Sequence, residues 1–296
     1  MSGEPIFVVG AQRSGTTMFR LMLNAHPRIS IPFESGFIPS FYKRLSEYGD
    51  LSLKENQATL LRDIADHPLM KKGKLIQDVE QLSSLPISNY ADLVTAIFSN
   101  YAQSKRKARW GDKTPSYVTE LDIIWKLFPG CKVIHLVRDG RDVALSMGAM
   151  DWGSKNLIRL AQEWVWKTTL GHKMGSLIGD NFLEIRYEDL ILETEATLKK
   201  VCSFIDEEYK AEMLSYHNSA RDEMPSESIQ YHKTSVSRPD QSKVFGWKTK
   251  MSRTDRIIFE DVARNALTRF GYEIENQRFT LGAKLKQIYY CAIRRW

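Results

Sequence analysis

The segment Gly10–Thr17, with the sequence Gly-Ala-Gln-Arg-Ser-Gly-Thr-Thr, combines two glycines, one arginine and three hydroxyl side chains. Glycines allow a tight turn whose backbone N–H groups point inward, and a helix that begins there adds the positive end of its dipole. Arg13 adds a full positive charge to this loop. We therefore predict that the Gly10–Thr17 loop binds an anion of the phosphate type.

The Gly10–Thr17 loop departs from the nucleoside triphosphatase pattern G-x-x-x-x-G-K-[ST] at one position. Gly10 and Gly15 occupy the glycine positions, but Thr16 stands where the lysine is required. In triphosphatases that lysine contacts the β- and γ-phosphates, and an acid at a strand end holds Mg²⁺. We expect a loop that uses Arg13 and does not bind a magnesium triphosphate.

A second candidate anion site follows the apolar run Val133–Val137, where Arg138 stands at the predicted strand end and Ser146 lies on the following predicted helix. A guanidinium at a strand end offers a planar fork that matches phosphate oxygens. A triphosphatase would carry its acidic magnesium ligand here. The alternative is structural, with Arg138 forming an ion pair with Asp142 that caps the helix.

Glu34 and Lys113 are candidates for proton transfer and charge stabilisation. Glu34 is either a favourable charge at a helix N-terminus or a carboxylate placed to take a proton from a hydroxyl group. Lys113 lies near a predicted strand end, which is where open α/β sheets bind ligands. Lys113 either faces the anion of the Gly10–Thr17 loop or is an ordinary surface lysine.

These residues require a scaffold in which strands and helices alternate. Apolar runs predict strands that end near Val9, Lys113, Val137 and Arg186, and each is followed by helical periodicity. This alternation predicts an α/β fold, a three-layer sandwich with a mostly parallel central sheet and a P-loop-like strand-loop-helix at the N-terminus. A chain of 296 residues is compatible with one large domain over 1–296.

Three regions fall outside this alternation. Residues 37–108 show helical patterns and few strand signals, which predicts a helical insertion. Residues 221–250 are polar with little periodicity, and their hydroxyl and basic groups suit a lid over a phosphorylated ligand. The basic tail Leu281–Trp296 is compatible with a membrane surface, although packing onto the domain is the expected role.

Composition excludes several classes of protein. The net charge of +6 reflects either a mixed surface or a site for anions. The sequence has no basic stripe interleaved with aromatic residues, so nucleic-acid binding is not expected. The three cysteines Cys131, Cys202 and Cys291 lie far apart, so neither a metal site nor a disulfide framework is expected. The N-terminus shows no leader pattern, and no apolar run has the roughly 18 residues of a membrane span. We expect a cytoplasmic enzyme.

Together these motifs resemble those of the sulfotransferases that use 3′-phosphoadenosine 5′-phosphosulfate (PAPS). The segment Gln12–Thr17 resembles the family's 5′-phosphosulfate loop, and Arg138–Ser146 resembles its 3′-phosphate motif. The likeness is closest to the branch that contains tyrosylprotein sulfotransferases and many bacterial enzymes. In that branch the loop continues to His-Pro and a catalytic glutamate, which correspond here to His26-Pro27 and Glu34. Arg186–Leu190 matches the branch's strand-end signature.

The resemblance implies in-line transfer of a sulfuryl group from PAPS to a hydroxyl or amine, leaving adenosine 3′,5′-bisphosphate and requiring no metal. Glu34 would be the general base, while Arg13 and Lys113 would stabilise charge on the transferring group. The implied nucleotide-binding residues are Arg13, Ser14, Gly15, Thr16, Thr17, Arg138, Ser146, Tyr187 and Ser237. The family often places a cation directly before a tryptophan, which corresponds here to Trp247. Because that position is not basic in this chain, Lys243 or Lys248 would substitute for the cation.

The expected acceptor is a small molecule, a carbohydrate or a lipid. Met150 stands where the tyrosylprotein branch carries an arginine, which argues against a protein tyrosine as substrate. Two other interpretations stay open, a P-loop-type kinase and a non-catalytic nucleotide-binding protein of the same fold. No oligomeric state is predicted.

Overall fold

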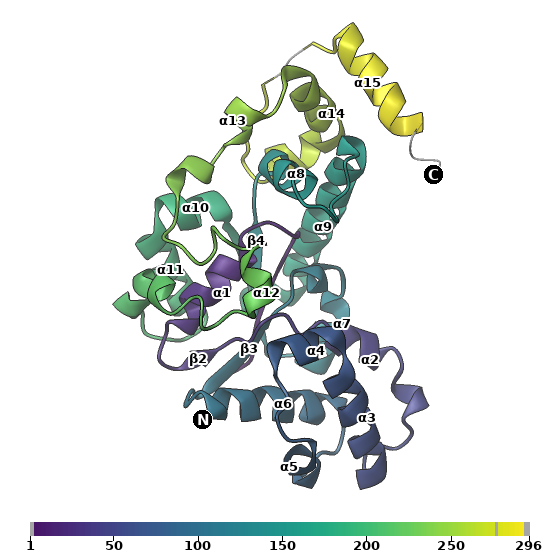
Figure 1. The fold of residues 1–296 in the computed structure, drawn as a ribbon, viewed down its shortest axis with the longest axis vertical. Helices are drawn as coiled ribbons and strands as arrows, with labels where there is room; N and C mark the ends of the chain where they lie inside the picture. Colours follow the sequence, from purple (N-terminus) through teal and green to yellow (C-terminus); the bar gives the residue numbers. More distant parts are fainter. Residues whose placement is uncertain (1–2, 276–277, 293–296) are drawn as a thin grey trace.

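The computed structural model describes residues 3–275 and 278–292, which are built around a five-stranded sheet (Figure 1). The strand order is β2-β3-β1-β4-β5, and every pairing is parallel. The strands are β1 (Ile6–Gly10), β2 (Ile29–Ser30), β3 (Arg109–Lys113), β4 (Lys132–Val137) and β5 (Phe182–Arg186). The predicted α/β class is confirmed. Because β1 lies between β3 and β4, the segments that leave these three strands meet at one edge of the sheet.

Helices cover both faces of this sheet and extend beyond its edges (Figure 1). The longer ones are α1 (Thr16–Asn24), α3 (Lys54–Asp66), α6 (Tyr90–Ser104), α8 (Gly140–Gly148), α9 (Leu157–Ile178), α11 (Thr194–Phe204), α14 (Arg253–Arg269) and α15 (Leu281–Ala292). The shorter ones are α2 (Ile38–Tyr42), α4 (Pro68–Gly73), α5 (Val79–Ser84), α7 (Leu121–Leu127), α10 (Tyr187–Leu192), α12 (Ser226–Ile229) and α13 (Trp247–Lys250). The 3₁₀ helices are Leu45–Glu47, Pro115–Thr119, Gly179–Asn181, Ala211–Asn218 and Gln241–Lys243.

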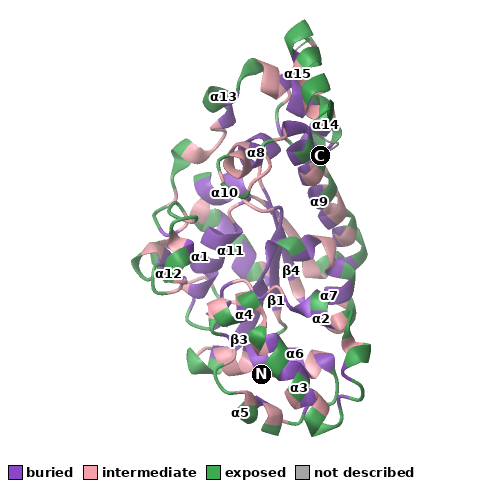
Figure 2. Cartoon of the chain, turned by 45° about the vertical axis from the view of Figure 1, so that its right-hand side comes forward, coloured by how far each residue is buried: buried purple, intermediate pink, exposed green. Residues whose placement is uncertain are grey.

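The core follows the alternation of side chains along β1. Phe7 and Val9 pack with α2, α3, α6, α7 and the end of α9 on one face of the sheet. Ile6 and Val8 pack with α1, α10 and α11 on the other face. All four side chains are completely buried, as a central parallel strand requires. Strands β1 to β4 therefore lie in the buried interior of the molecule, whereas the edge strand β5 is mostly only partly buried (Figure 2).

A third cluster of buried side chains lies beyond the carboxyl end of β4. It joins α8, α9, α13 and α14 and includes Val137 from β4 itself. This cluster supports the turn that carries Arg138, so the position of Arg138 depends on packing contributed by the last third of the chain.

The regions outside the strand-helix alternation contain short and long helices. Residues 37–108 contain α2 to α6 ahead of β3. Residues 221–250 are not free of structure, because α12, α13 and the 3₁₀ helix Gln241–Lys243 lie within them. Asp240 caps that 3₁₀ helix by accepting a hydrogen bond from the Ser242 amide, and Trp247 is fully buried. The cap and the buried tryptophan stabilise a defined structure in residues 221–250, although their sequence shows little periodicity.

The tail residues 281–292 form α15, which packs against α14 and α9, while residues 293–296 of the predicted tail lie outside the described residues. Cys131 and Cys202 are buried free thiols, whereas Cys291 is exposed. Among the helices of the described residues, none combines the length and the apolar character needed to cross a membrane.

Candidate active site

The Gly10–Thr17 loop connects β1 to α1 through a tight turn with left-handed backbone. Arg13 has φ 69° and Gly15 has φ 92°. A Cβ atom at position 15 would lie 2.4 Å from Cδ2 of Tyr187, so the close approach of that ring requires glycine. The strained conformation of Arg13 is of the kind that functional loops retain. The amides of the first turn of α1 have no partner within the helix and are available to an anion.

The ends of β1, β3 and β4 and the start of α10 meet around a cavity of about 380 Å³. Its lining includes the following predicted site residues: Arg13, Gly15, Thr16, Thr17, Glu34, Arg138, Ser146 and Tyr187. Residues from the 221–250 region form another part of the wall, namely Ser228, Tyr231, His232, Thr234 and Ser235. Parts of the sequence that are far apart thus contribute to one site.

Glu34 lines this cavity and forms an ion pair with Lys113, which is not itself among the lining residues. Lys113 Nζ lies 2.5 Å from Glu34 Oε1 and 3.4 Å from Thr17 Oγ1. The Lys113 side chain is fully buried, whereas that of Glu34 is 26% exposed. The surface alternative for Lys113 is therefore wrong. The same ammonium also lies 5.4 Å from the centre of the Phe33 ring. Contacts from α1 and from the segment after β2 therefore fix the ammonium that β3 carries.

The electrostatics of this pair keep Glu34 ionised. Burial alone would raise the pKa of the carboxyl, but the charge and hydrogen bond of Lys113, helped by His232 and Arg20, outweigh it and lower the pKa of Glu34 below its ordinary value. Burial lowers the pKa of the Lys113 ammonium, and Glu34 opposes that shift. The site thus contains a carboxylate that is available to accept a proton at neutral pH.

Arg13 and Ser146 meet across the cavity. Arg13 Nε donates to Ser146 Oγ at 3.0 Å, and its Nη1 donates to the backbone carbonyl of Tyr231 at 3.1 Å. Burial lowers the pKa of Arg13, nearby Arg138 lowers it further, and Glu34 opposes both. Two guanidinium groups in one cavity repel each other, and an anion bound between them would relieve that repulsion.

Arg138 lines the cavity and also forms the ion pair with Asp142 that the structural alternative predicted. Its guanidinium carbon lies 4.4 Å from the centre of the Tyr187 ring at the cavity wall, and Nη2 lies 3.8 Å from the Asp142 carboxylate. The guanidinium also donates to the backbone carbonyls of Arg13, at 3.3 Å, and Lys243, at 3.1 Å. Within the described part of the chain, Nε of Arg138 is buried without a hydrogen-bond partner. A buried donor of this kind is typical of a binding site for an acceptor-rich ligand.

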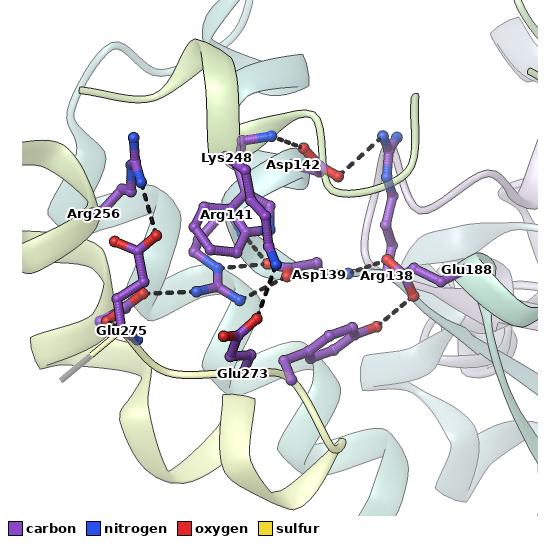
Figure 3. A network of polar contacts seen from close by, with 12 residues as sticks. Arg138, Asp139, Arg141, Asp142, Glu188, Lys248, Arg256, Glu273 and Glu275 are labelled. Carbon is purple, nitrogen blue, oxygen red and sulfur yellow. Dashed lines mark hydrogen bonds and ion pairs between the residues drawn. The ribbon is translucent and has the colours of Figure 1, made fainter. Parts of the chain in front are cut away.

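A buried network of charges fixes the turn that follows Arg138 (Figure 3). Arg141 donates to Asp139 at 2.8 Å and to Glu260 at 2.6 Å, and its guanidinium stacks 3.5 Å from the Trp247 ring. The Asp139 amide donates to Glu188 at 3.0 Å. Because Glu188 lies in the first turn of α10 and Glu260 lies in α14, this network ties the end of β4 to both helices and holds Arg138 in place.

His232 is a site residue that the sequence analysis did not identify. It lines the cavity, where burial, the charges of Lys113 and Arg13, and to a smaller extent Arg20 lower its pKa to about 4 despite the opposing charge of Glu34. The imidazole is therefore neutral at pH 7. No local signal marks it, because His232 reaches the cavity only through the path of the 221–250 region.

Several predicted residues lie outside the cavity lining. Ser14 is fully buried within the loop, and its hydroxyl has no hydrogen-bond partner within the described part of the chain. The Ser237 hydroxyl donates to the backbone carbonyl of Lys233 at 3.2 Å, and the side chains of Lys243 and Lys248 lie near Asp240 and Glu273 at 3.8 and 2.8 Å. A nucleotide contact from Ser237, Lys243 or Lys248 stays a prediction. Over residues 3–275 and 278–292, no group of three His, Cys, Asp or Glu residues has a metal-binding arrangement.

Comparison with known proteins places this geometry in context. A family model described as the sulfotransferase family matches residues 5–211. The chain is 24% identical over 231 residues to an uncharacterised protein of Aquifex aeolicus, a match that covers 74% of this chain and 28% of that protein. It is 25% identical over 207 residues to a protein-tyrosine sulfotransferase of Drosophila melanogaster, covering 68% of this chain and 38% of that protein. The chain thus spans well under half the length of these two relatives.

A solved structure shows the same fold. The sulfotransferase domain from the Synechococcus PCC 7002 olefin synthase aligns with a TM-score of 0.64 at 22% sequence identity. The alignment covers 92% of this chain and 96% of that domain.

Proposed function

The chain belongs to the sulfotransferase family, and from this premise we propose that it moves a sulfuryl group from PAPS to a hydroxyl or amine of a small-molecule, carbohydrate or lipid acceptor. The observation that carries this proposal is the Glu34–Lys113 pair, at 2.5 Å and beside Thr17, in which Glu34 lines the cavity that Arg13 also lines. In the proposed reaction this base and the two cations would act where a proton leaves the acceptor and negative charge develops.

The residues present suit a nucleotide with phosphate at two positions. The Gly10–Thr17 loop, with Arg13 and the first amides of α1, would hold the 5′-phosphosulfate. Arg138 and Ser146 would hold the 3′-phosphate, and the Tyr187 ring would lie near the nucleotide. The buried, unpartnered Nε of Arg138 supports this assignment, since a phosphate oxygen would satisfy it. When bound, PAPS supplies the activated sulfuryl group and leaves as adenosine 3′,5′-bisphosphate.

Three residues of the chain would take part in the transfer. Glu34 would accept the proton of the acceptor hydroxyl, for which its lowered pKa keeps it ionised. Lys113 would orient that carboxylate, and together with Arg13 it would stabilise negative charge as it develops at the end of the loop. Both cations are already fixed by contacts with Thr17 and Ser146, so little reorganisation is needed.

The remaining wall of the cavity supports an acceptor with apolar surface. Phe33, Leu69 and Trp152 line it together with Lys72 and His232. Phe33 is adjacent in sequence to Glu34 and its ring packs beside the Lys113 ammonium, so an acceptor lying on this ring would present its hydroxyl close to the base. An aromatic and aliphatic wall suits a lipid, an aromatic compound or a sugar face.

Product analysis tests this proposal. The protein is incubated with PAPS and a panel of phenols, sugars, lipids and tyrosine peptides, with EDTA present, and adenosine 3′,5′-bisphosphate and sulfated acceptor are quantified by mass spectrometry. We expect equimolar formation of both products with at least one non-peptide acceptor. No consumption of PAPS with any acceptor, together with transfer of phosphate from ATP to an acceptor in a parallel reaction that contains Mg²⁺ and no EDTA, would contradict the proposal and favour a kinase.

A further inference from the structure

The helix α15 carries its apolar side chains on the side that faces solvent. Leu281, Leu285, Ile288 and Tyr289 are 74%, 61%, 65% and 62% exposed. At about 100° per residue these four positions fall within roughly one third of the helix circumference. A surface helix ordinarily turns its apolar stripe toward the core, so this arrangement is the reverse of the usual one. Figure 2 shows α15 as a largely exposed element at one end of the molecule.

The opposite side of α15 attaches the helix to the protein. Ala283 is fully buried, and the backbone carbonyl of Tyr290 accepts a hydrogen bond from Asn156 at 2.8 Å. Lys286 forms an ion pair with Asp255 of α14 at 2.7 Å. These contacts fix the rotation of the helix about its own axis. The exposed apolar face is therefore held away from the core by α9 and α14.

The charge of this segment is one-sided. From Arg278 to Trp296 the sequence contains five Lys or Arg residues and no Asp or Glu. Lys284 is exposed and lies beside the apolar face, and Tyr289 is an aromatic side chain with a polar end. An apolar face that has a cation beside it and includes an aromatic ring with a polar tip has the composition of a helix that lies in a lipid headgroup region.

We propose that α15 binds the surface of an anionic membrane, with Leu281, Leu285 and Ile288 inserted among the acyl chains and Lys284 near the headgroups. The charge favours this occupant over a second copy of the chain, because a symmetric contact through this face would place its lysines against each other. Apolar burial and attraction to anionic lipid act together, which is the combination that reversible surface binding needs. The helix would bring the enzyme to the membrane without spanning it.

Vesicle sedimentation of the full chain tests this inference. One set of vesicles is pure phosphatidylcholine and the other contains about a third phosphatidylserine. We expect binding to the anionic vesicles that weakens as salt is raised, and at least about tenfold weaker binding for L285S/I288S, because two inserted side chains are lost. Leu177→Ser is the matched control, since Leu177 is 75% exposed on α9 and lies outside the proposed surface; it should bind like the natural protein.

Two results would overturn the inference. One is the absence of binding to anionic vesicles, or equal binding by L285S/I288S. The other is a dimer in light scattering that the same double substitution dissociates, which would assign the face to a second copy of the chain. Circular dichroism and the nucleotide affinity of the double variant establish that it is folded. Because sedimentation requires no turnover, the result is independent of whether the proposed sulfuryl transfer is correct.

Discussion

Replacing Glu34 by glutamine separates proton transfer from nucleotide binding. The amide keeps the size of the side chain and an oxygen for Lys113, but it cannot take a proton. General base catalysis contributes about 10²- to 10⁴-fold, which corresponds to about 3–5 kcal/mol of transition-state stabilisation. We expect kcat/KM of Glu34→Gln to fall by that factor. Affinity for adenosine 3′,5′-bisphosphate should stay the same or increase, because a negative charge near the Gly10–Thr17 loop is removed.

The same substitution also has a structural consequence. Lys113 is fully buried and loses its charged partner, and loss of one member of a buried pair costs about 3–5 kcal/mol. Because Glu34 is 26% exposed, screening by water reduces this, and we expect about 2 kcal/mol of lost unfolding free energy. Chemical denaturation measures this loss and establishes that the variant is still folded in the activity assay.

The matched control is Glu184→Gln. Its carboxylate is also 26% exposed and also contacts a buried partner, His135 Nδ1, at 3.0 Å, but it lies outside the cavity lining. Glu184→Gln should keep its kcat even if its stability falls. The reasoning would be refuted if Glu34→Gln bound adenosine 3′,5′-bisphosphate normally and retained kcat/KM within about threefold of the natural protein, well short of the loss expected for a general base.

Three further outcomes are expected. Arg138→Ala should weaken binding of adenosine 3′,5′-bisphosphate by about 1.5–3 kcal/mol in calorimetry, while the affinity for adenosine 5′-phosphosulfate should barely change. Equal losses for the two ligands would contradict the 3′-phosphate role of Arg138. The control is Arg186→Ala, at an arginine outside the cavity. Lys113→Met should lower kcat by about 10²- to 10³-fold, whereas Lys199→Met, at a surface lysine paired with Glu195, should not, and stopped assays compare the two. Because the pKa of Glu34 is lowered below its ordinary value, kcat/KM should stay flat from about pH 7 to about pH 5, and an acid limb near pH 6 would be inconsistent. The stability supplied by the ion pair is present above the unfolded pKa and should disappear only as pH falls through the lower folded pKa.

The sequence predicted the strand ends well because the signal there is local. The apolar runs before Gly10 and Arg138 are short, buried on both faces and followed directly by helical spacing. In a parallel sheet the carboxyl ends of neighbouring strands lie at the same edge, so a strand end that is located in the sequence is also located at that edge. Arg13 and Arg138 therefore meet in the structure as their positions implied, with Arg138 donating to the Arg13 carbonyl.

The partners of these residues depend on contacts that local patterns do not contain. Lys113 was equally compatible with the surface, and only the path of the chain after β2 places Glu34 against it. His232 reaches the cavity through a segment that shows no periodicity and was expected to be an unstructured lid. The orientation of α15 was unpredictable for another reason, since its apolar stripe alone indicates a buried face whereas the small Ala283 makes the contact.

The central claim is that the cavity binds a nucleotide with phosphate at the 3′ and 5′ positions and without metal. Calorimetric titration with adenosine 3′,5′-bisphosphate and with ADP, each with and without Mg²⁺, tests it most directly. We predict a clear preference for the bisphosphate that Mg²⁺ does not change. Preference for ADP in the presence of Mg²⁺ would contradict the roles of Thr16 and Arg138 and favour a kinase.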